Sequence, residues 1–320
     1  MNSYFNQITS TGILPVIKVE KTEHAVPLAK ALRAGGLNAI EVTIRSEAAY
    51  DAIHAISQAF PDMAVGAGTV LTADQADRAL AAGAKYIVAP GLDPEIVSHC
   101  QRAGVVPVPG CSTGTEITAA VSLGLNVIKF FPAELSGGTA AIKLLSGPFP
   151  DVKFIPTGGI EESNLASYLR LDAVAACGGS FMARADVIRA ENWDAITAAC
   201  KKMVDLSMGF ELAHVGVNEP DEKTALADAD RMAELLRMQP KIGNSSVFAG
   251  KAVEFMKKPY LGSNGHIGYY ANSASRALAW FRSQGVSVRE DTIRTNAQGK
   301  VLSFYLQEEI GGFAVHVVNR

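Results

Sequence analysis

The sequence predicts an α/β protein, a (β/α)8 TIM barrel, followed by a smaller α+β domain built from βαβββ repeats. Two observations lead to this prediction. From Gly12 to about residue 205, short β-branched runs alternate with alanine-rich segments of helical period. Beyond that point the alternation stops, and a strand–helix–strand order occurs twice. A chain of 320 residues is long enough for two domains, which we place at residues 1–206 and 207–320.

The predicted barrel has eight strands, each followed by a helical pattern. The strands are residues 13–19, 39–44, 64–70, 86–90, 105–109, 127–131, 153–157 and 173–177. Helices between them include residues 24–34, 48–60, 73–82, 94–103 and 115–123, and residues 191–208 form the closing helix. Gly35, Gly83 and Gly104 are typical helix stops. In such barrels the chemistry lies at the C-terminal ends of the strands.

Composition excludes several classes of function. Hydrophobic residues make up 48% and the net charge is −3, so nucleic acid and anionic membranes are not expected partners. The N-terminus lacks the features of a secretory signal, and no apolar run approaches the roughly 20 residues of a membrane span. The cysteines are far apart, which favours reduced packing thiols and a cytoplasmic location. They are Cys100, Cys111, Cys177 and Cys200.

One lysine lies in an apolar run of strand-like length. Lys129 is surrounded by valine, isoleucine and phenylalanine within residues 126–133. Because burial disfavours the charged form of an amine, a lysine in such surroundings becomes a candidate nucleophile for a Schiff base with a ketone. The alternative is a lysine that extends from a strand end to pair with a carboxylate.

Polar residues and glycines follow the other strands. Glu41, Thr43 and Arg45 alternate, so they share one face of the second strand. A carboxylate inside an apolar barrel is costly unless it is paired or functional, and Lys129 lies on the strand across the barrel. After the seventh and eighth strands come the glycine pairs 158–159 and 178–179, where barrels commonly bind phosphate through backbone N–H groups.

These residues resemble those of the class I aldolases that cleave 2-keto-3-deoxy-6-phosphogluconate (KDPG) or 4-hydroxy-2-oxoglutarate (KHG). The matching stretches are residues 35–45, 65–70, 88–91, 109–110, 128–134, 147–149, 154–160 and 177–180. The resemblance implies that Lys129 forms the Schiff base and that Glu41 is the general acid/base. It further implies that other residues bind the substrate. These are Arg45 and Thr69 at the carboxylate, Gly158, Gly159 and Ser180 at the phosphate, and Pro90 and Phe131 in the pocket wall. Lys18 stands where several relatives carry arginine, so recognition of the distal substrate end is less defined.

The resemblance implies a homotrimer, a small phosphorylated 2-keto acid as substrate, and no cofactor for the aldolase reaction. KHG and the galactonate epimer of KDPG are alternative substrates, because the same lysine and glutamate would serve them. A non-enzymatic alternative is a barrel that binds a sugar phosphate and signals to the C-terminal domain. The lysine–glutamate pair argues against it, since a pure binding protein has no use for a buried amine beside a carboxylate.

The last hundred residues form an internal repeat that resembles the glyoxalase-like, or vicinal oxygen chelate, superfamily. The predicted strands are residues 210–217, 251–256, 265–270, 286–292, 301–307 and 313–318, the helices are 221–238 and 274–284, and a hinge lies near 260–264. The resemblance implies a divalent metal held by the first and last strands of each half. The ligands at those positions would be His214, Glu254, His266 and His316. The competing interpretations are a second metal-dependent active site, a ligand sensor, and a structural module that extends the oligomer.

Overall fold

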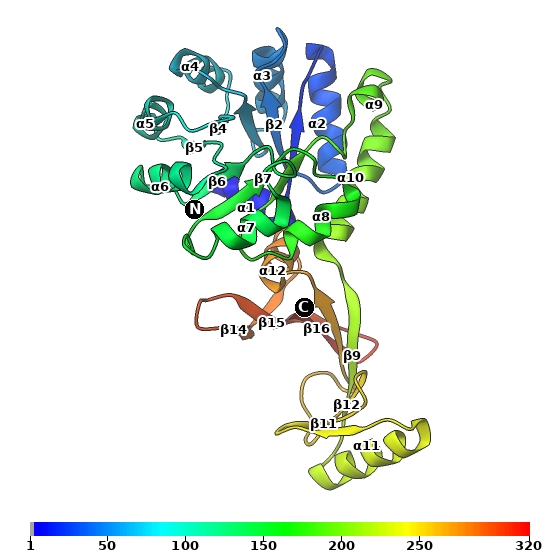
Figure 1. Ribbon diagram of the computed structural model, residues 1–320. Coiled ribbons are helices and arrows are strands. Elements are labelled where there is room, and N and C mark those ends of the chain that lie inside the picture. The colour runs from blue at the N-terminus through cyan, green and yellow to red at the C-terminus, as the bar shows by residue number, and fades with distance from the viewer. Residues whose placement is uncertain (1–2) are drawn as a thin grey trace. The chain divides into compact units, whose positions relative to one another are not determined.

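The computed structural model describes residues 3–320, which form two compact units divided between residues 207 and 208. The first unit is an eight-stranded parallel barrel with helices on its outside (Figure 1). Its strands are β1 (Ile13–Ile17), β2 (Ala39–Thr43), β3 (Ala64–Gly68), β4 (Tyr86–Val88), β5 (Val106–Val108), β6 (Val127–Phe130), β7 (Lys153–Pro156) and β8 (Cys177–Gly179). The predicted (β/α)8 class is therefore confirmed.

The barrel closes through two hydrogen-bonded groups of strands. Six strands pair in the order β5-β4-β3-β2-β1-β8, and β6 pairs with β7. Isolated parallel bridges join the groups, one between Gly110 and Lys129 at one edge and two at the other edge, between Phe154 and Val174 and between Thr157 and Gly178. Because β-bridges link both edges, the strands form a complete circle.

The helices follow the strands in alternation. They are α2 (Ala25–Ala34), preceded by the 3-10 turn η1 (Thr22–His24), α3 (Ala49–Ala59), α4 (Ala73–Ala81), α5 (Pro94–Arg102), α6 (Gly114–Ser122), α7 (Gly138–Leu145), α8 (Glu162–Leu169), α9 (Ala185–Arg189) and α10 (Trp193–Met208). The sequence determines some ends directly: Asp93 caps α5 ahead of Pro94, and Thr113 with Glu116 forms a capping box on α6. These caps satisfy amides that would otherwise have no partner.

A helix that the strand–helix alternation did not predict precedes the barrel. Helix α1 (Ser3–Thr11) contributes Phe5 and Ile8 to the core, where they pack with Ala39 and Ala64 from the first residues of two strands. Its sequence is rich in threonine and serine, which are weak helix formers. Tertiary packing against the N-terminal end of the barrel therefore stabilises this helix, and the local sequence alone does not reveal it.

The eighth strand lies later in the chain than the sequence pattern predicted. Residues 173–177 were expected to form it, but β8 spans Cys177–Gly179, and Val174 makes only a single bridge, to Phe154. Glycine is a weak strand former, so the sequence pattern gave no sign that the strand includes Gly178 and Gly179. Gly178 pairs with Leu14, and a Cβ at Gly178 would lie 2.4 Å from Oγ1 of Thr157. Only glycine allows this close approach.

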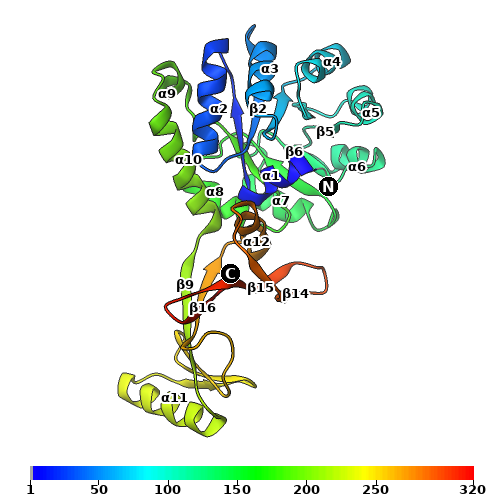
Figure 2. The ribbon, with the colours of Figure 1, turned by 180° about the vertical axis from the view of Figure 1, so that it is seen from behind.

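The second unit contains one eight-stranded sheet of two βαβββ halves (Figure 2). The first half is β9 (Glu211–Asn218), α11 (Glu222–Leu236), β10 (Pro240–Ile242), β11 (Ser246–Ala249) and β12 (Val253–Met256). The second half is β13 (Gly265–Ala271), α12 (Ala274–Ser283), β14 (Val288–Thr295), β15 (Val301–Ile310) and β16 (Phe313–Asn319). The strand order in the sheet is β10-β11-β12-β9-β13-β16-β15-β14. The first strands of the two halves, β9 and β13, are therefore neighbours at the centre, and each half continues outward from there in the same order.

The repeat is present, but two strands of its first half were not predicted. Strand β10 is short and fully exposed, and β11 follows it through a tight connection. A short exposed strand carries no hydrophobic alternation, so no period-2 signal marks it. The residues of β11 are identified by their packing instead, since Val247 and Ala249 pack against Ala225 and Ala229 of α11.

The glycine pair before the last strand forms a hairpin turn. Gly311 and Gly312 have φ values of 60° and 79° and connect β15 to β16. Two consecutive positive φ angles match a two-residue turn that suits the twist of a hairpin.

The four cysteines are free and buried, in agreement with packing thiols. Burial raises the pKa of Cys100 to about 11 and those of Cys111 and Cys200 to about 12. Among the described residues, no helix is both long and apolar enough to cross a membrane.

Candidate active site in the barrel and candidate metal site in the second unit

The barrel interior holds a buried pair of opposite charges. Lys129 extends from β6 and Glu41 from β2, and the lysine Nζ lies 3.3 Å from Oε1 of the carboxylate. The side chains are 8% and 1% exposed. Nζ also lies 5.4 Å from the ring centre of Phe131, which follows the same strand. The amine is therefore shielded from bulk water and lies beside one buried carboxylate.

Glycines in β3 make room for this pair. A Cβ at Gly68 would lie 2.1 Å from Oε1 of Glu41, and a Cβ at Gly66 would lie 2.2 Å from the ring of Tyr86. The hydroxyl of Tyr86 donates a hydrogen bond to the carbonyl of Ile40, 2.9 Å away. Burial, together with the charge of Glu41, raises the pKa of Tyr86 well above its ordinary value, so the phenol stays neutral. Tyr86 and Gly68 were not among the predicted site residues.

The residues predicted to hold a carboxylate lie at the ends of β2 and β3. Arg45 is exposed, and its Nε donates to Oγ1 of Thr43 at 3.3 Å. Thr69 follows Gly68 with a left-handed φ of 60°. Such a φ is uncommon outside glycine and marks a backbone that its surroundings hold in place. Arg45 and Thr69 thus follow the strands that carry Glu41 and Gly68.

The glycines after β7 adopt a conformation that only glycine accepts readily. Gly158 and Gly159 have φ values of 97° and 80°. A Cβ at Gly159 would lie 2.5 Å from the side chain of Glu134, whose carboxylate accepts a hydrogen bond from Tyr168. Ser180 follows β8 and is exposed. Among residues 3–320, nothing accepts a hydrogen bond from the amides of Gly158, Gly159 or Ser180, which leaves those amides available for an anion.

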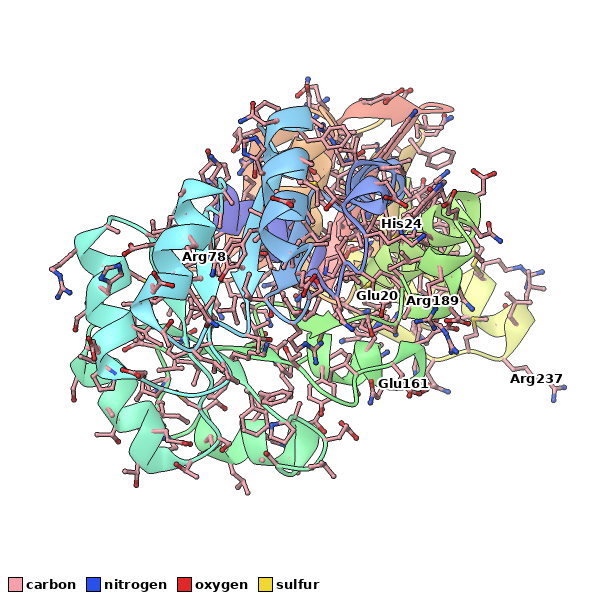
Figure 3. All side chains as sticks on the ribbon, turned by 90° about the horizontal axis from the view of Figure 1, so that it is seen from above. Glu20, His24, Arg78, Glu161, Arg189 and Arg237 are labelled. Carbon is pink, nitrogen blue, oxygen red and sulfur yellow. The ribbon has the colours of Figure 1, made fainter. Side chains whose placement is uncertain are left out.

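The remaining predicted residues line the barrel ends. Pro90 is half-buried, and its carbonyl lies 2.0 Å from where a Cβ of Gly110 would be. Lys18 is exposed and pairs with Glu20 at 3.3 Å, and Arg189 approaches the same carboxylate at 3.5 Å. Figure 3 shows Glu20 and Arg189 side by side. The hydrogen bond and charge of Lys18 lower the pKa of Glu20. Lys18 thus has a carboxylate partner that was not predicted.

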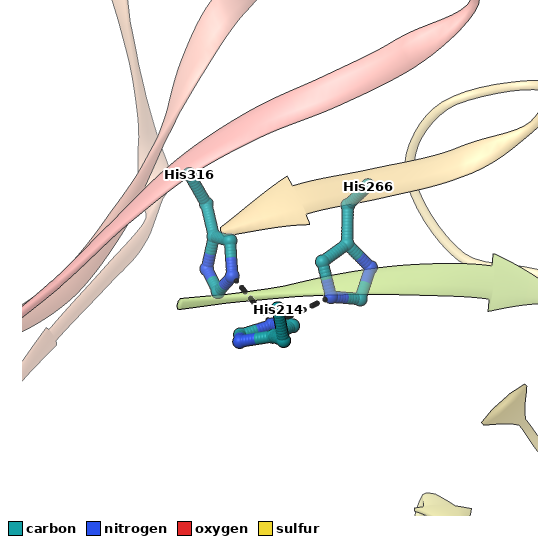
Figure 4. Close-up of side chains that lie close together, drawn as sticks. All are labelled: His214, His266 and His316. Carbon is teal, nitrogen blue, oxygen red and sulfur yellow. Dashed lines mark hydrogen bonds between the residues drawn. The ribbon is translucent and has the colours of Figure 1, made fainter. Parts of the chain in front are cut away.

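A second cluster of polar side chains lies in the sheet of the second unit. Nε2 of His214 is 3.1 Å from Nε2 of His266 and 3.0 Å from Nε2 of His316, and Figure 4 shows the three imidazoles converging. Oε2 of Glu254 lies 3.1 Å from Nε2 of His266 and 3.4 Å from Nε2 of His214. The ligand atoms of the three histidines lie within 4.8 Å of one another, and Glu254 contacts two of them, so the four predicted ligands form one cluster.

The register of the sheet explains this convergence. Gly216 of β9 is paired with Glu254 on one side and His266 on the other. Gly268 of β13 is paired with His214 and His316 in the same manner. A Cβ at Gly216 would lie 2.0 Å from the ring of His266, and one at Gly268 would lie 2.6 Å from each of its two histidines. Each half of the repeat thus supplies one glycine that makes space for the ligands beside it.

The contacts among the histidines fit a cation better than hydrogen bonds. A neutral imidazole has one N–H, so Nε2 of His214 can donate to only one of its three close neighbours. In the remaining contacts, lone pairs on two acceptor atoms would face each other, which is unfavourable without a cation between them. Ligand atoms about 2.1 Å from one cation are separated by about 3.0 Å in octahedral and about 3.4 Å in tetrahedral geometry. The four separations given above, 3.0–3.4 Å, match those values.

Burial and neighbouring groups shift the pKa values of side chains in the cluster. Burial lowers the pKa of His316 to about 3, helped by the neighbouring histidines, and burial also lowers the pKa of His214. Burial works to raise the pKa of Glu254, but hydrogen bonds from His266 and Ser246 outweigh it and the net shift is downward. At neutral pH the set is therefore two neutral imidazoles beside an ionised carboxylate. Nδ1 of His266 is buried and has no partner within the described residues.

The cluster opens into a cavity of about 560 Å³. Besides the four polar residues above, the cavity is lined by Ser245, Phe248, Met256, Lys258, Tyr260, Thr292, Arg294, Ser303, Tyr305 and Val318. The ring of Tyr305 stacks on that of His316 with centres 4.5 Å apart. This volume lies within the usual range for small-molecule sites.

A parallel barrel with a buried lysine–carboxylate pair defines the first unit as an enzyme of the Schiff-base aldolase class. Comparison with known proteins names the group. The sequence model of the aldolase family described as KDPG and KHG aldolase matches residues 5–199. This segment is more than half of the chain, and the chain belongs to that family. The matched segment ends before the second unit begins.

Individual relatives agree. The chain is 45% identical over 206 residues to the 2-dehydro-3-deoxy-phosphogluconate aldolase of Treponema pallidum, covering 64% of this chain and 98% of that one. It is 43% identical over 198 residues to the KHG/KDPG aldolase of Escherichia coli K12, covering 62% and 93%. The solved KDPG aldolase of Legionella pneumophila, with pyruvate captured as a covalent carbinolamine, matches with TM-score 0.61 and 38% identity, covering 63% of this chain and 98% of that one.

Proposed function

We propose that the barrel cleaves KDPG to pyruvate and glyceraldehyde 3-phosphate, with Lys129 as the Schiff-base residue and Glu41 as the general acid/base. The observation that carries this proposal is the contact of 3.3 Å between Nζ of Lys129 and the carboxylate of Glu41 inside an apolar barrel. A buried carboxylate beside a buried amine can take a proton from the amine and return it during catalysis.

The proposed reaction follows from these two groups. The amine of Lys129 adds to the C2 ketone, and loss of water gives an iminium. Glu41 takes the proton of the C4 hydroxyl while the C3–C4 bond breaks and its electron pair moves toward the iminium. The aldehyde leaves, Glu41 returns a proton to C3 of the enamine, and hydrolysis frees pyruvate. The iminium is the electron sink, so this mechanism uses no metal or organic cofactor.

The substrate's two ends have separate candidate sites. Arg45 and Thr69 would bind the pyruvyl carboxylate. The amides of Gly158 and Gly159, together with Ser180, would bind the phosphate, and Pro90 and Phe131 would line the pocket between them. The distal group of KDPG is a phosphate, whereas that of KHG is a second carboxylate. Free backbone N–H groups suit the phosphate better, which favours KDPG over KHG as the substrate. The galactonate epimer would use the same groups.

Lys18 would contribute to the distal end of the substrate. Its ammonium has a carboxylate partner in Glu20, so its charge is partly neutralised. The non-enzymatic alternative, a barrel that binds a sugar phosphate and signals to the second unit, does not account for the buried amine beside Glu41.

Reductive trapping tests the barrel assignment. Wild-type protein incubated with pyruvate and borohydride should gain one pyruvyl adduct at Lys129, detected by peptide mass spectrometry. Lys129→Met should abolish the adduct, whereas Lys143→Met, which removes an exposed lysine of α7, should retain it. Full trapping in Lys129→Met would show that the lysine is misassigned. Comparing kcat/KM for KDPG and KHG then decides the substrate.

We also infer that the second unit binds one divalent cation through His214, Glu254, His266 and His316. The convergence of four donor atoms, with separations of 3.0–3.4 Å where the structure gives them, supports this site. Three imidazoles and one carboxylate suit zinc, manganese, iron or nickel. Metal analysis of the purified protein tests the site. One equivalent is expected in the wild type, with loss in His214→Ala.

The remaining assignments extend these two proposals. The paired βαβββ halves support a glyoxalase-like second domain beginning near residue 207, after an aldolase domain of residues 1–206. A homotrimer is proposed from the resemblance alone, and light scattering after gel filtration measures it. The measured mass should then be three times the monomer mass of 33.8 kDa.

A further inference from the structure

The cavity above the histidine cluster contains two cationic side chains that have no counter-charge. Lys258 follows β12 and Arg294 lies on β14, so each half of the repeat supplies one. Neither has an ion-pair partner among residues 3–320, although the neighbouring Lys257 pairs with Glu222 and Arg289 pairs with Glu309. The two cations that line the cavity are therefore available to a ligand.

The charge of the cavity favours an anion. Among the residues that the structure describes, Glu254 is the only acidic one that lines it. With neutral imidazoles, a bound divalent cation would leave the cluster with a net charge of about +1, and the two side chains raise the total to about +3. An anionic ligand would remove most of this uncompensated charge.

Shape limits the size of the ligand. The cavity volume of about 560 Å³ is in the range used for small molecules. Phe248, Met256 and Val318 provide an apolar wall, and Ser245, Thr292 and Ser303 provide hydroxyl groups. A ligand with a short carbon chain, oxygen substituents and charged ends would satisfy both kinds of surface.

We propose that the second unit binds a small acid with two anionic groups, a carboxylate at the metal and a phosphate at Arg294 and Lys258. This inference rests on the metal site proposed above. A planar guanidinium pairs with phosphate through two parallel hydrogen bonds, which makes Arg294 the residue that selects for it. The uncleaved substrate proposed for the barrel belongs to this class. Its products do not, because pyruvate carries only a carboxylate and glyceraldehyde 3-phosphate only a phosphate.

Cobalt absorption spectroscopy gives a readout confined to the second unit. The Lys129→Met protein would be loaded with Co²⁺, and the visible bands of the metal followed during titration. The probes are 3-phosphoglycerate and glycerate, which differ only in the phosphate, and glycerol 3-phosphate, which lacks the carboxylate. We expect 3-phosphoglycerate to shift the bands with at least tenfold lower Kd than glycerate, and glycerol 3-phosphate to leave them nearly unchanged.

Two variants identify the phosphate partner. Arg294→Gln should bring the Kd of 3-phosphoglycerate to within about threefold of that of glycerate, because one charge-assisted pair is lost. Lys257→Gln, which removes an already paired lysine of the same unit, should leave the ratio unchanged. Equal affinities for the two acids in cobalt-loaded protein, or an unchanged ratio in Arg294→Gln, would overturn the ligand assignment alone. Absence of cobalt bands would overturn the metal site and this proposal with it.

Discussion

The carboxylate of Glu41 occupies the space that a side chain at Gly68 would need. A Cβ at position 68 would lie 2.1 Å from Oε1 of Glu41, and Gly68 pairs in register with Thr43 on the adjacent strand. The glycine of β3 therefore determines where the carboxylate can lie, and with it the distance of 3.3 Å to Lys129. The acid/base partner is positioned by a residue with no side chain.

Gly68→Ala should displace the Glu41 carboxylate and reduce turnover. A shift of about 1 Å in a catalytic group can reduce the rate by roughly 100-fold, so we expect a fall in kcat of that order. Borohydride trapping of pyruvate should persist, because Lys129 is not obstructed. Gly114→Ala is the matched control, since the nearest atom to its Cβ would be 4.0 Å away. Wild-type turnover in Gly68→Ala would contradict the proposed role of this contact.

Glu41→Gln should separate imine formation from proton transfer. The amide keeps the size of the side chain but cannot act as a base. We expect kcat for KDPG cleavage to fall by roughly 100- to 10,000-fold, the usual contribution of a general acid/base. The steady-state rate and the yield of the pyruvyl adduct would be measured on the same preparation. A rate within a few-fold of the wild type would assign proton transfer to another group.

The chemistry of the barrel could be predicted further than its packing. Lys129 stood out because it is the one charge in an apolar run, and Glu41 because alternation placed it inside. Gly68 and Tyr86 were missed, because their role depends on which side chain of the neighbouring strand enters their space. Glu20 was missed although it lies two residues from Lys18, because an exposed acidic residue next to a strand carries no pattern that marks it as a partner, and its second contact, Arg189, is far away in the sequence. Helix α1 and strand β8 depend on tertiary packing that no local period reports.

In the second unit, too, the candidate ligands could be predicted from the sequence, but some strands and cavity residues could not. The repeat aligned His214, Glu254, His266 and His316 at corresponding positions, and the structure brings all four together. Strand β10 was not predicted, because its exposed residues have no alternation. The cations Lys258 and Arg294 were also missed, since residues that line a cavity without contacting one another leave no pattern in the sequence.

Ser180→Ala should affect phosphorylated substrates selectively. Ser180 follows β8, is exposed, and is proposed to donate its hydroxyl to the phosphate. A hydrogen bond to a charged group contributes about 1.5–3 kcal/mol, so KM for KDPG should rise by roughly 10-fold or more. KM for KHG, which has no phosphate, should remain within about twofold. Equal changes for both substrates would place Ser180 elsewhere in the pocket.

Gly268→Ala should weaken metal binding without replacing a ligand. A Cβ at this position would lie 2.6 Å from both His214 and His316, so the two rings must separate. We expect at least a tenfold loss of zinc affinity by isothermal titration, with the aldolase rate unchanged. Gly216→Ala should act in the same way through His266, because the register repeats. Retention of full affinity in both variants would argue that the histidines do not share one cation.

Removal of metal should destabilise the second unit alone. A ligand at 100 times its Kd stabilises the folded state by about 2.7 kcal/mol. For a unit of this size, losing that energy should lower Tm by roughly 10 °C or more. Calorimetry of the full chain with and without a chelator should show this shift in one of two transitions, and KDPG cleavage should be unaffected. His266→Ala supplies the control, because its transition should no longer respond to the chelator. A chelator-sensitive transition in that variant, or a parallel fall in aldolase activity, would place the metal outside the histidine cluster.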